Sequence, residues 1–359
     1  MNNVIENFQA VRLDDEANTL IVLDQTLLPN ETVFLMLNEM EEIWEAIYKL
    51  RVRGAPAIGV AAGYGVYLGA KQSNAQTYEA FCEDFMKVKN YLASSRPTAV
   101  NLFWALDRMN DRLKQEVGKS VPQIKAALKE EADMIRQEDE RTCLAIGEYA
   151  LSLLKPGDGI LTHCNAGTIA TAKYGTSLSA IYLGQEKGYN FKVYADETRP
   201  LLQGARLTAW ELQMAGVDVT LICDSTASIV MKENKIQAIL VGCDRVAANG
   251  DTANKIGTSS VAILAKHYKI PFYVCGPLST IDFKCKTGDD INIELRPPEE
   301  VTSLWYSCPM APKDVKVYNP AFDVTDHSLI TAIITEYGIA YPPFNENLPK
   351  ICNIRIGDV

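Results

Sequence analysis

The sequence predicts an α/β protein with a mainly helical N-terminal domain and a C-terminal domain built on a Rossmann-like, doubly wound parallel sheet. The first observation is a change of hydrophobic period near Pro156, from helical spacing to short apolar runs. The second is the length of 359 residues, which exceeds what one core usually holds. The third is composition, since 47% hydrophobic and 22% charged residues are typical of a folded globular chain. We expect two domains, residues 1–155 and 156–359.

The N-terminal part carries apolar residues at near-helical spacing in several stretches. Residues 32–50 are predicted as one helix. Residues 54–70 are uncharged and rich in glycine and alanine, too short for a membrane span, and predict a tightly packed internal helix that begins near Pro56. A further apolar helix is expected after Arg96, and residues 123–154 form a long amphipathic stretch.

The C-terminal part alternates short apolar runs with helical stretches, the pattern of βαβ units in a parallel sheet. The predicted strands lie at residues 159–163, 191–195, 217–222, 238–242 and 271–275.

Polar side chains and small residues follow these predicted strands. Because the carboxyl ends of parallel strands meet at one edge, a ligand site is expected there. The residues at those ends are Cys164 and Asn165, Asp196 and Glu197, Asp224, Asp244, and Gly276. The glycine-rich dinucleotide fingerprint and the Walker lysine motif are both absent from the sequence, so a nucleotide is not indicated.

Cys164 lies in the run Thr162-His-Cys-Asn-Ala-Gly, which is predicted as a strand-to-helix turn. A thiol at a helix N-terminus is favoured as thiolate and could act as acid, base or nucleophile. The alternative is a buried structural cysteine, the commoner role of a free thiol. His163 is expected to face the opposite side of the strand and to make a structural hydrogen bond.

Asp244 follows the predicted strand 238–242, and burial at a strand end would raise the pKa of its carboxyl towards the range useful for proton transfer. The alternatives are an ion pair with Arg245 or a helix cap. Downstream, Asn254 and Lys255 are predicted at a helix start, where they would suit a phosphate or sugar hydroxyls.

Two arginines, Arg53 and Arg96, precede predicted helix starts and could each hold a phosphate, although a lone arginine is more often a surface ion pair. Gln203 follows the strand at 191–195 in a polar run and could reach a sugar. From the residues alone, we expect a small phosphorylated ligand with a thiol and a carboxylate as candidate acid and base.

The net charge, the few histidines and the spacing of the cysteines argue against several kinds of partner and site. The formal net charge of −10 disfavours nucleic acid and anionic lipid as partners. Three dispersed histidines and nine cysteines without a C-x-x-C pair argue against a zinc site. The acidic, polar start of the sequence and the odd cysteine count lead us to expect a cytoplasmic protein with reduced thiols.

Six segments in the same order resemble the family of methylthioribose-1-phosphate isomerases. This family also includes the regulatory subunits of a eukaryotic translation-initiation exchange factor and the archaeal ribose-1,5-bisphosphate isomerases. The segments begin Arg53-Gly-Ala-Pro, Arg96-Pro-Thr, Thr162-His-Cys-Asn, Asp196-Glu-Thr-Arg, Gly242-Cys-Asp-Arg and Phe322-Asp-Val-Thr.

The resemblance implies an aldose–ketose isomerase of methionine salvage that acts on a sugar phosphate, uses neither metal nor cofactor and forms a homodimer. It implies that Cys164 and Asp244 are the catalytic pair. The substrate-binding positions that it implies are Arg53, Gly54, Ala55, Arg96, Gln203, Asn254 and Lys255.

Three alternatives stay open. Cys243 and the run from Thr168 to Lys173 depart from the usual family pattern, which would allow 5-deoxyribose 1-phosphate as a competing or second substrate. A ribose-1,5-bisphosphate isomerase would need an additional basic cluster, which the sequence does not show. A non-catalytic regulatory subunit would have no evident need for both the thiol and the acid.

Overall fold

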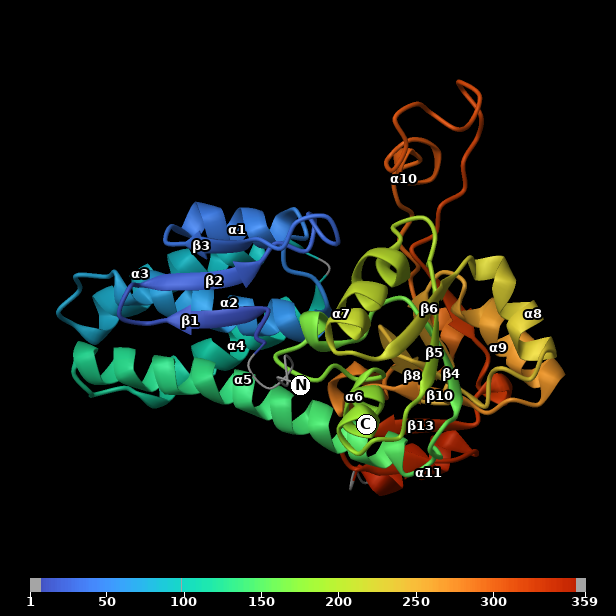
Figure 1. Ribbon diagram of the computed structural model, residues 1–359. Coiled ribbons are helices and arrows are strands. Elements are labelled where there is room, and N and C mark those ends of the chain that lie inside the picture. The colour runs from blue at the N-terminus through green and yellow to red at the C-terminus, as the bar shows by residue number, and fades with distance from the viewer. Residues whose placement is uncertain (1–7, 98, 353–359) are drawn as a thin grey trace. The chain divides into compact units, whose positions relative to one another are not determined.

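The computed structural model describes residues 8–97 and 99–352 (Figure 1). The chain forms two compact units, of which the first comprises Met1–Cys143 with Gly167–Gly175. The second comprises Leu144–Ala166 with Thr176–Val359. The boundary between the two units lies inside helix α5 (Val121–Leu151), because this long helix continues beyond the first unit. The sequence predicts a boundary at residues 155–156, where the helix has ended.

The first unit contains a three-stranded antiparallel sheet that the sequence analysis missed. It consists of β1 (Val11–Asp14), β2 (Thr19–Leu23) and β3 (Phe34–Leu37). The prediction of one helix over residues 32–50 is therefore wrong in its first part, and helix α1 spans only Met40–Tyr48. Residues 33–37 are a continuous apolar run, which fits a strand as well as a helix, and β3 pairs with the fully buried β2.

The other predicted helices of the first unit are confirmed. They are α2 (Ala55–Lys71), α4 (Val100–Gln115) and α5, to which the structure adds α3 (Tyr78–Ala93). Helix α2 begins with Pro56 in its first turn and is buried along almost its whole length.

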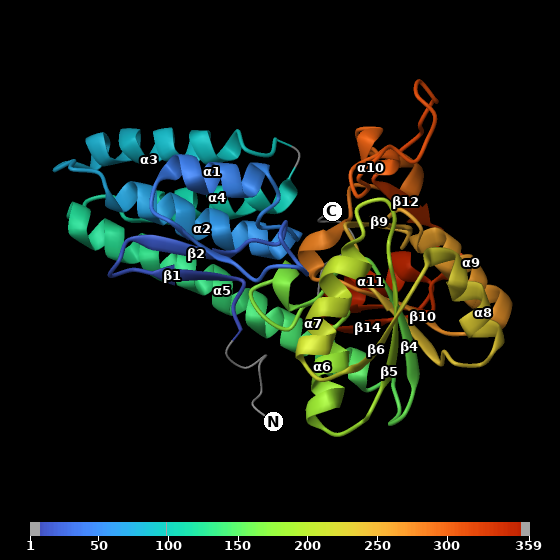
Figure 2. The same ribbon diagram turned by 45° about the horizontal axis from the view of Figure 1, so that its top comes forward.

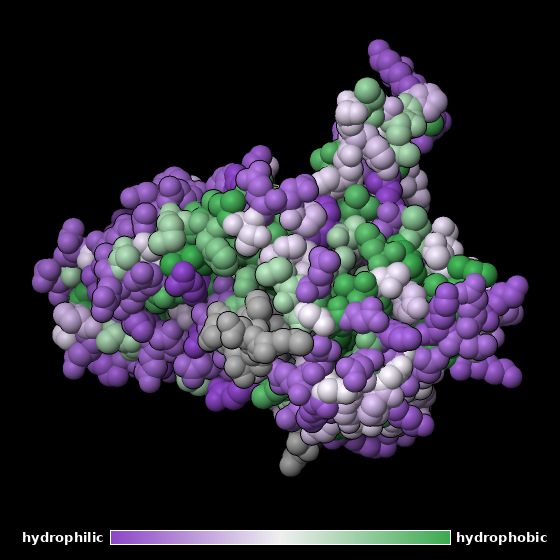
Figure 3. All heavy atoms as spheres, viewed as in Figure 1, coloured by the Kyte–Doolittle hydropathy of each residue, from purple (hydrophilic) through white to green (hydrophobic). Residues whose placement is uncertain are grey.

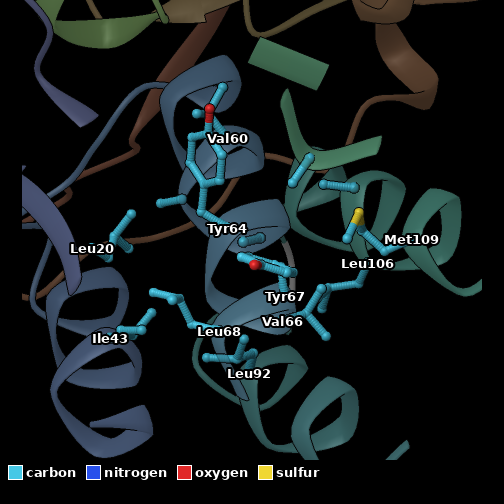
Figure 4. Close-up of a cluster of buried hydrophobic side chains, with 14 of the residues drawn as sticks. Leu20, Ile43, Val60, Tyr64, Val66, Tyr67, Leu68, Leu92, Leu106 and Met109 are labelled. Carbon is cyan, nitrogen blue, oxygen red and sulfur yellow. The ribbon is translucent and has the colours of Figure 1, made fainter. Parts of the chain in front are cut away.

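Helix α2 is the centre of the first hydrophobic core, where Leu20 and Ile43 come from β2 and α1, and Leu106 and Met109 from α4 (Figure 4). Its glycines allow close helix packing. A Cβ built on Gly69 would lie 2.5 Å from Val88 Cγ1 of α3, so no larger residue fits without displacement.

The second unit contains a seven-stranded sheet in the order β14-β13-β10-β7-β4-β5-β6, parallel except for β14. The strands are β4 (Gly159–His163), β5 (Lys192–Asp196), β6 (Asp218–Ile222), β7 (Ala238–Val241), β10 (Phe272–Cys275), β13 (Ala332–Thr335) and β14 (Gly338–Ala340). All five predicted strands form and the prediction of a parallel sheet is confirmed, while β13 and β14 were missed.

Helices cover both faces of this sheet, with α6 (Ser179–Glu186) and α7 (Ala209–Met214) on one side and α8 (Ala227–Lys232) and α9 (Thr258–Tyr268) on the other (Figure 2). The last helix is α11 (Phe344–Ile351). The central strands β4 and β7 are fully buried, as expected for a sheet covered on both faces.

A smaller four-stranded sheet of the second unit has the order β11-β8-β9-β12. Its strands are β11 (Ile281–Asp282), β8 (Arg245–Ala247), β9 (Thr252–Lys255) and β12 (Phe322–Thr325). Between β11 and β12, a segment carrying the short helix α10 (Glu299–Thr302) projects from the second unit (Figures 1 and 2). Within the described residues, no helix has the length and apolar character that crossing a membrane requires.

Candidate active site at the strand ends

The central strands of the large sheet bring the predicted catalytic positions to one edge. Strand β4 pairs in parallel with β7, where His163 lies opposite Val241, and with β5, where Thr162 lies opposite Ala195. Cys164 follows β4 directly, and Asp244 follows β7 after Gly242 and Cys243. The chain order of the strands reverses between β4 and β7, which is where open parallel sheets bind ligands.

Cys164 is buried and has a left-handed backbone, with φ of 64°. Its N–H donates to Thr198 Oγ1 at 2.8 Å, and its carbonyl accepts from Thr208 Oγ1 at 2.6 Å. A left-handed conformation costs a residue with a side chain about 1 kcal/mol or more, so these two bonds hold the backbone in an otherwise unfavourable state.

The expectation that Cys164 opens a helix is wrong. The chain after it forms a 3₁₀ turn, η1 (Thr168–Ala170), and helix α6 begins only at Ser179. Residues 167–175 leave the second unit and pack with the first, which delays the helix. The dipole of a following helix therefore does not act on this thiol.

His163 makes the structural hydrogen bonds that were expected. Its side chain is fully buried, with Nδ1 at 3.0 Å from Asp196 Oδ2 and Nε2 at 2.9 Å from the carbonyl oxygen of Ile256. Burial raises the pKa of Asp196 to about 6, although the contact with His163 opposes this. Burial alone would lower the pKa of His163, but the hydrogen bond and charge of Asp196 raise it overall.

Asp244 is exposed, which corrects the expectation of a desolvated carboxyl at a strand end. Strand β7 ends at Val241, and Asp244 lies in the connection to β8 (Arg245–Ala247), after the buried Gly242 and the half-buried Cys243. The N–H of Asp244 donates to the carbonyl oxygen of Ala253 at 2.9 Å. Arg245 pairs with Asp282 at 3.6 Å. The backbone of Asp244 is thus fixed by β9, while the residue as a whole is exposed.

Asn254 and Lys255 are buried at the end of β9 rather than at a helix start. The N-terminus of α9 does not offer a free anion site, because Asp323 accepts the N–H groups of Gly257 and Ser259 at 2.8 and 3.1 Å. Lys255 Nζ lies 5.0 Å from the centre of the Phe322 ring. Any phosphate in this region would be bound by side chains, above all by the lysine.

Gln203 is buried at the start of a π-helical turn, η2 (Gly204–Thr208). Its Oε1 accepts no hydrogen bond from any residue that the structure describes. A buried amide oxygen without a donor is unfavourable by about 1–3 kcal/mol, so this atom is suited to accept a bond from a ligand hydroxyl.

The remaining predicted site residues belong to the first unit. Gly54 precedes α2 with φ of 91°, and a Cβ built on it would lie 2.3 Å from the carbonyl oxygen of Ala170. Ala55 is the first residue of α2, and Arg53 and Arg96 are half-buried near the starts of α2 and α4.

Sequence reasoning placed Asp224 at a strand end but did not predict that it supports a neighbouring loop, and it missed Thr198 and Thr208. Asp224 accepts the N–H groups of Thr198 and Arg199 at 2.7 and 2.8 Å, which orders the loop after β5. Thr208 accepts from Asn165 Nδ2 at 3.1 Å in addition to its bond to Cys164. Thr198 lies in the polar run after β5, a signal that could have drawn attention to it, but nothing local distinguishes Thr208.

One cluster at this edge has the spacing of a metal site. Ligand atoms of His163, Asp196 and Asp224 lie within 4.8 Å of one another. However, His163 Nδ1 already contacts Asp196, and both carboxylate oxygens of Asp224 accept backbone N–H groups. We interpret the cluster as a structural hydrogen-bond network.

Comparisons with known proteins agree on one family. The sequence profile described as the Initiation factor 2 subunit family matches residues 51–342. A protein of Symbiobacterium thermophilum, named methylthioribose-1-phosphate isomerase, is 67% identical over 96% of both chains. A protein of Petrotoga mobilis, named 5-deoxyribose 1-phosphate isomerase, is 62% identical over 95% of this chain and 98% of its own. The crystal structure of 5-methylthioribose 1-phosphate isomerase from Pyrococcus horikoshii OT3 has a TM-score of 0.94 and 44% identity, and covers 98% of each chain.

Proposed function

Since the chain belongs to the Initiation factor 2 subunit family, we propose that it is an aldose–ketose isomerase that converts 5-methylthioribose 1-phosphate to 5-methylthioribulose 1-phosphate in methionine salvage. The observation that carries this proposal is that a thiol, Cys164, and a carboxyl, Asp244, follow two adjacent parallel strands at the edge where the strand order reverses. Such a pair can supply the acid and the base that an isomerisation needs.

The chemistry assigns each group a role. The anomeric oxygen of the substrate is phosphorylated, so the sugar ring cannot open to a free aldehyde without assistance. Asp244, which follows β7 at the point where the strand order reverses, donates a proton to the ring oxygen once the bound substrate shields its carboxyl from water. Cys164, whose backbone is fixed on both sides, takes part in moving hydrogen from C2 to C1. In deuterated water, deuterium at C1 of the product supports an enediol that exchanges with solvent, and its absence counts against one.

The acidic protein must bind the phosphate through local cations. Lys255 is a buried cation of the second unit near the strand ends, and Asn254 precedes it. Arg53 and Arg96 with the backbone of Gly54 and Ala55 are the candidates of the first unit, which we propose contributes the phosphate-binding arginines. Gln203 Oε1 accepts from a sugar hydroxyl.

A second substrate, 5-deoxyribose 1-phosphate, is favoured by the names of several relatives at 55–62% identity. The two sugars differ only at the 5-substituent, remote from C1 and C2 where the proposed chemistry takes place. We expect turnover of both, and competition of one sugar against the other measures the preference.

The test of function is an assay of the purified protein with the methylthio, the deoxy and the bisphosphate sugars. Turnover of the first two is expected, and turnover of none would refute the enzyme. Cys164→Ala and Asp244→Asn should each lower kcat by about 10²–10⁴-fold, the usual contribution of an acid or base. Matched controls are Cys308→Ala at an exposed cysteine and Asp218→Asn at the opposite end of the sheet.

The alternatives predict different outcomes of the same assay. A ribose-1,5-bisphosphate isomerase would prefer the bisphosphate. A non-catalytic regulatory subunit would bind the sugars without turnover in the wild type, and Cys164→Ala would leave that binding unchanged. The presence of both Cys164 and Asp244 at one edge favours the enzyme.

We also propose a Rossmann-like fold for the second unit, a homodimer and a cytoplasmic location. The six parallel strands, numbered along the chain, follow the order 3-2-1-4-5-6, which supports the first point. Leu304, Met310 and Tyr318 of the projecting segment are exposed, which supports a protein–protein contact. Figure 3 shows hydrophobic atoms among pale and hydrophilic ones on this segment. The nine free cysteines support a reducing compartment.

A further inference from the structure

His163 occupies the end of β4, and its imidazole is fully enclosed. Both ring nitrogens are used, Nδ1 towards Asp196 Oδ2 and Nε2 towards the carbonyl oxygen of Ile256. A carbonyl oxygen only accepts hydrogen bonds, so Nε2 carries a hydrogen and donates it. The hydrogen bond between His163 Nδ1 and Asp196 Oδ2 then holds one further proton, which is bonded to one of these two atoms.

From Asp196, a short chain of hydrogen bonds leads to Cys164. The carbonyl oxygen of Asp196 accepts from Thr198 Oγ1 at 3.0 Å, and the same Oγ1 accepts from the N–H of Cys164 at 2.8 Å. The second carboxylate oxygen of Asp196, Oδ1, is buried without a hydrogen-bond partner among the described residues. The imidazole is therefore the main support of this carboxyl.

From Ile256, the connection leads to the proposed phosphate-binding residues, because Ile256 directly follows Lys255. The next residue, Gly257, has φ of 104°, and a Cβ built on it would lie 2.8 Å from His163 Cε1. The imidazole thus fills the space beside this backbone and fixes it both by contact and by a hydrogen bond.

We propose that His163, although it touches no reacting atom, is a positioning residue that fixes the position of the Cys164 thiol relative to Lys255. Its Nδ1 acts on Cys164 through Asp196, and its Nε2 acts on Lys255 through Ile256. This inference rests on the proposed function. The Nδ1 contact supports the residue that takes part in hydrogen transfer, so its loss should lower kcat. The Nε2 contact supports the residue that binds the phosphate, so its loss should raise KM. Small displacements of reacting groups change rates by up to about 10²-fold.

Two substitutions separate the contacts. In His163→Asn the side-chain amide can replace Nδ1 but cannot reach Ile256, so we expect KM to rise about tenfold while kcat falls less than threefold. In His163→Gln the amide can replace Nε2, but the contact with Asp196 is lost. We therefore expect kcat to fall about 10–100-fold, while KM stays within threefold of the wild-type value. The matched control is His267→Gln, at an exposed histidine of α9.

A second pair of variants covers the case in which a His163 variant fails to fold. Asp196→Ala should lose kcat as His163→Gln does, whereas Asp196→Asn keeps a hydrogen bond to Nδ1 and should restore most of that loss. Thermal unfolding followed by circular dichroism identifies the folded variants. Wild-type kcat and KM in folded His163→Gln and Asp196→Ala would overturn the proposal, as would equal effects of Asn and Gln at 163.

One measurement needs no substrate, so it distinguishes failure of this inference from failure of the proposed function. The rate at which iodoacetamide alkylates Cys164, followed by peptide mass spectrometry, should change at least threefold in His163→Gln and Asp196→Ala but not in His163→Asn. Unchanged rates in folded variants contradict the positioning role. If the wild type turns over no sugar phosphate while these rates shift as expected, the proposed function fails and the link between His163 and Cys164 stands.

Discussion

Two threonine hydroxyls hold the backbone of Cys164 from opposite sides. Thr198 accepts its N–H and Thr208 donates to its carbonyl, and these bonds maintain a left-handed residue directly after the buried strand β4. The direction of the thiol is therefore set by polar contacts from the loop after β5 and from the turn η2, not by a helix that follows it.

Thr198→Val removes the hydroxyl and keeps the shape of the side chain. It deprives the buried N–H of Cys164 of this acceptor, so the free energy of unfolding should fall by about 1–3 kcal/mol. A displaced thiol should also lower kcat at least tenfold. Urea unfolding and steady-state kinetics measure the two effects. Thr198→Ser keeps the hydroxyl and should lose much less, and equal losses in the two variants would contradict this explanation.

Asp139, in the part of α5 that belongs to the first unit, has a carboxyl whose burial raises its pKa to about 7. Its Oδ2 accepts the N–H of Ala172 at 2.6 Å. The folded state thus binds a proton that the unfolded state has released above pH 4, and the stability associated with that proton is lost as the pH rises through about 7.

We accordingly expect the stability of the wild type relative to Asp139→Asn to fall from pH 5 to about pH 7 and to stay level above that, because asparagine resembles the protonated acid but does not titrate. Urea unfolding at several pH values measures this difference. Asp111→Asn, at an exposed position of α4, is the control for the loss of one carboxylate. A pH-independent difference for Asp139→Asn would argue against the raised pKa.

The start of helix α2 requires a residue without a side chain directly before it. Gly54 directly before it has a positive φ, and a Cβ there would meet the backbone of Ala170. The same region is fixed by Gln25, whose Nε2 donates to the carbonyl oxygen of Ile169 at 2.7 Å. The start of α2 and the turn η1 are thus packed backbone against backbone within the first unit.

Gly54→Ala should lower the free energy of unfolding by more than about 2 kcal/mol, since it combines the left-handed penalty of about 1–2 kcal/mol with a steric clash. Gly118→Ala is the matched control, because Gly118 also has a positive φ of 84° but nothing lies within 4 Å of its added Cβ. It should show the backbone penalty alone. Equal destabilisation of the two variants, measured by urea unfolding, would mean that the backbone moves to avoid the clash with Ala170 without lowering the free energy of unfolding.

At the scale of the whole molecule, charge and surface composition bear on assembly. The net charge of −10 keeps copies of the chain apart at long range, but screening at physiological salt limits this repulsion to about 8 Å. Within that range, exposed apolar side chains can make contact. Those of the projecting segment are Leu295, Leu304, Tyr306, Met310, Val315 and Tyr318.

We expect light scattering at micromolar concentration to give about twice the chain mass of 39.7 kDa. Replacing Leu304 and Met310 with serine should shift the protein towards the monomer if the projecting segment takes part in the contact. Unchanged mass in that variant would place the contact elsewhere, whereas a monomeric wild type would contradict the homodimer.

Local pattern was sufficient for much of the fold. The strands of the large sheet are short apolar runs that end in polar residues, so the sequence alone located Cys164 and the approach to Asp244 at strand ends. It failed at β3, where the continuous apolar run of residues 33–37 adjoins the amphipathic helix α1 and was merged with it. Pairing with β2, a distant partner, decides that assignment.

The sequence by itself determined which residue types stand at the strand ends, because period and residue type are properties of neighbours along the chain. Only the tertiary structure decided what surrounds them. Asp244 is exposed in the connection from β7 to β8, and α9 offers no free N-terminus because Asp323 reaches it from β12. His163 connects the loop of Asp196 with that of Ile256. Such contacts join residues far apart in sequence, so no local spacing encodes them.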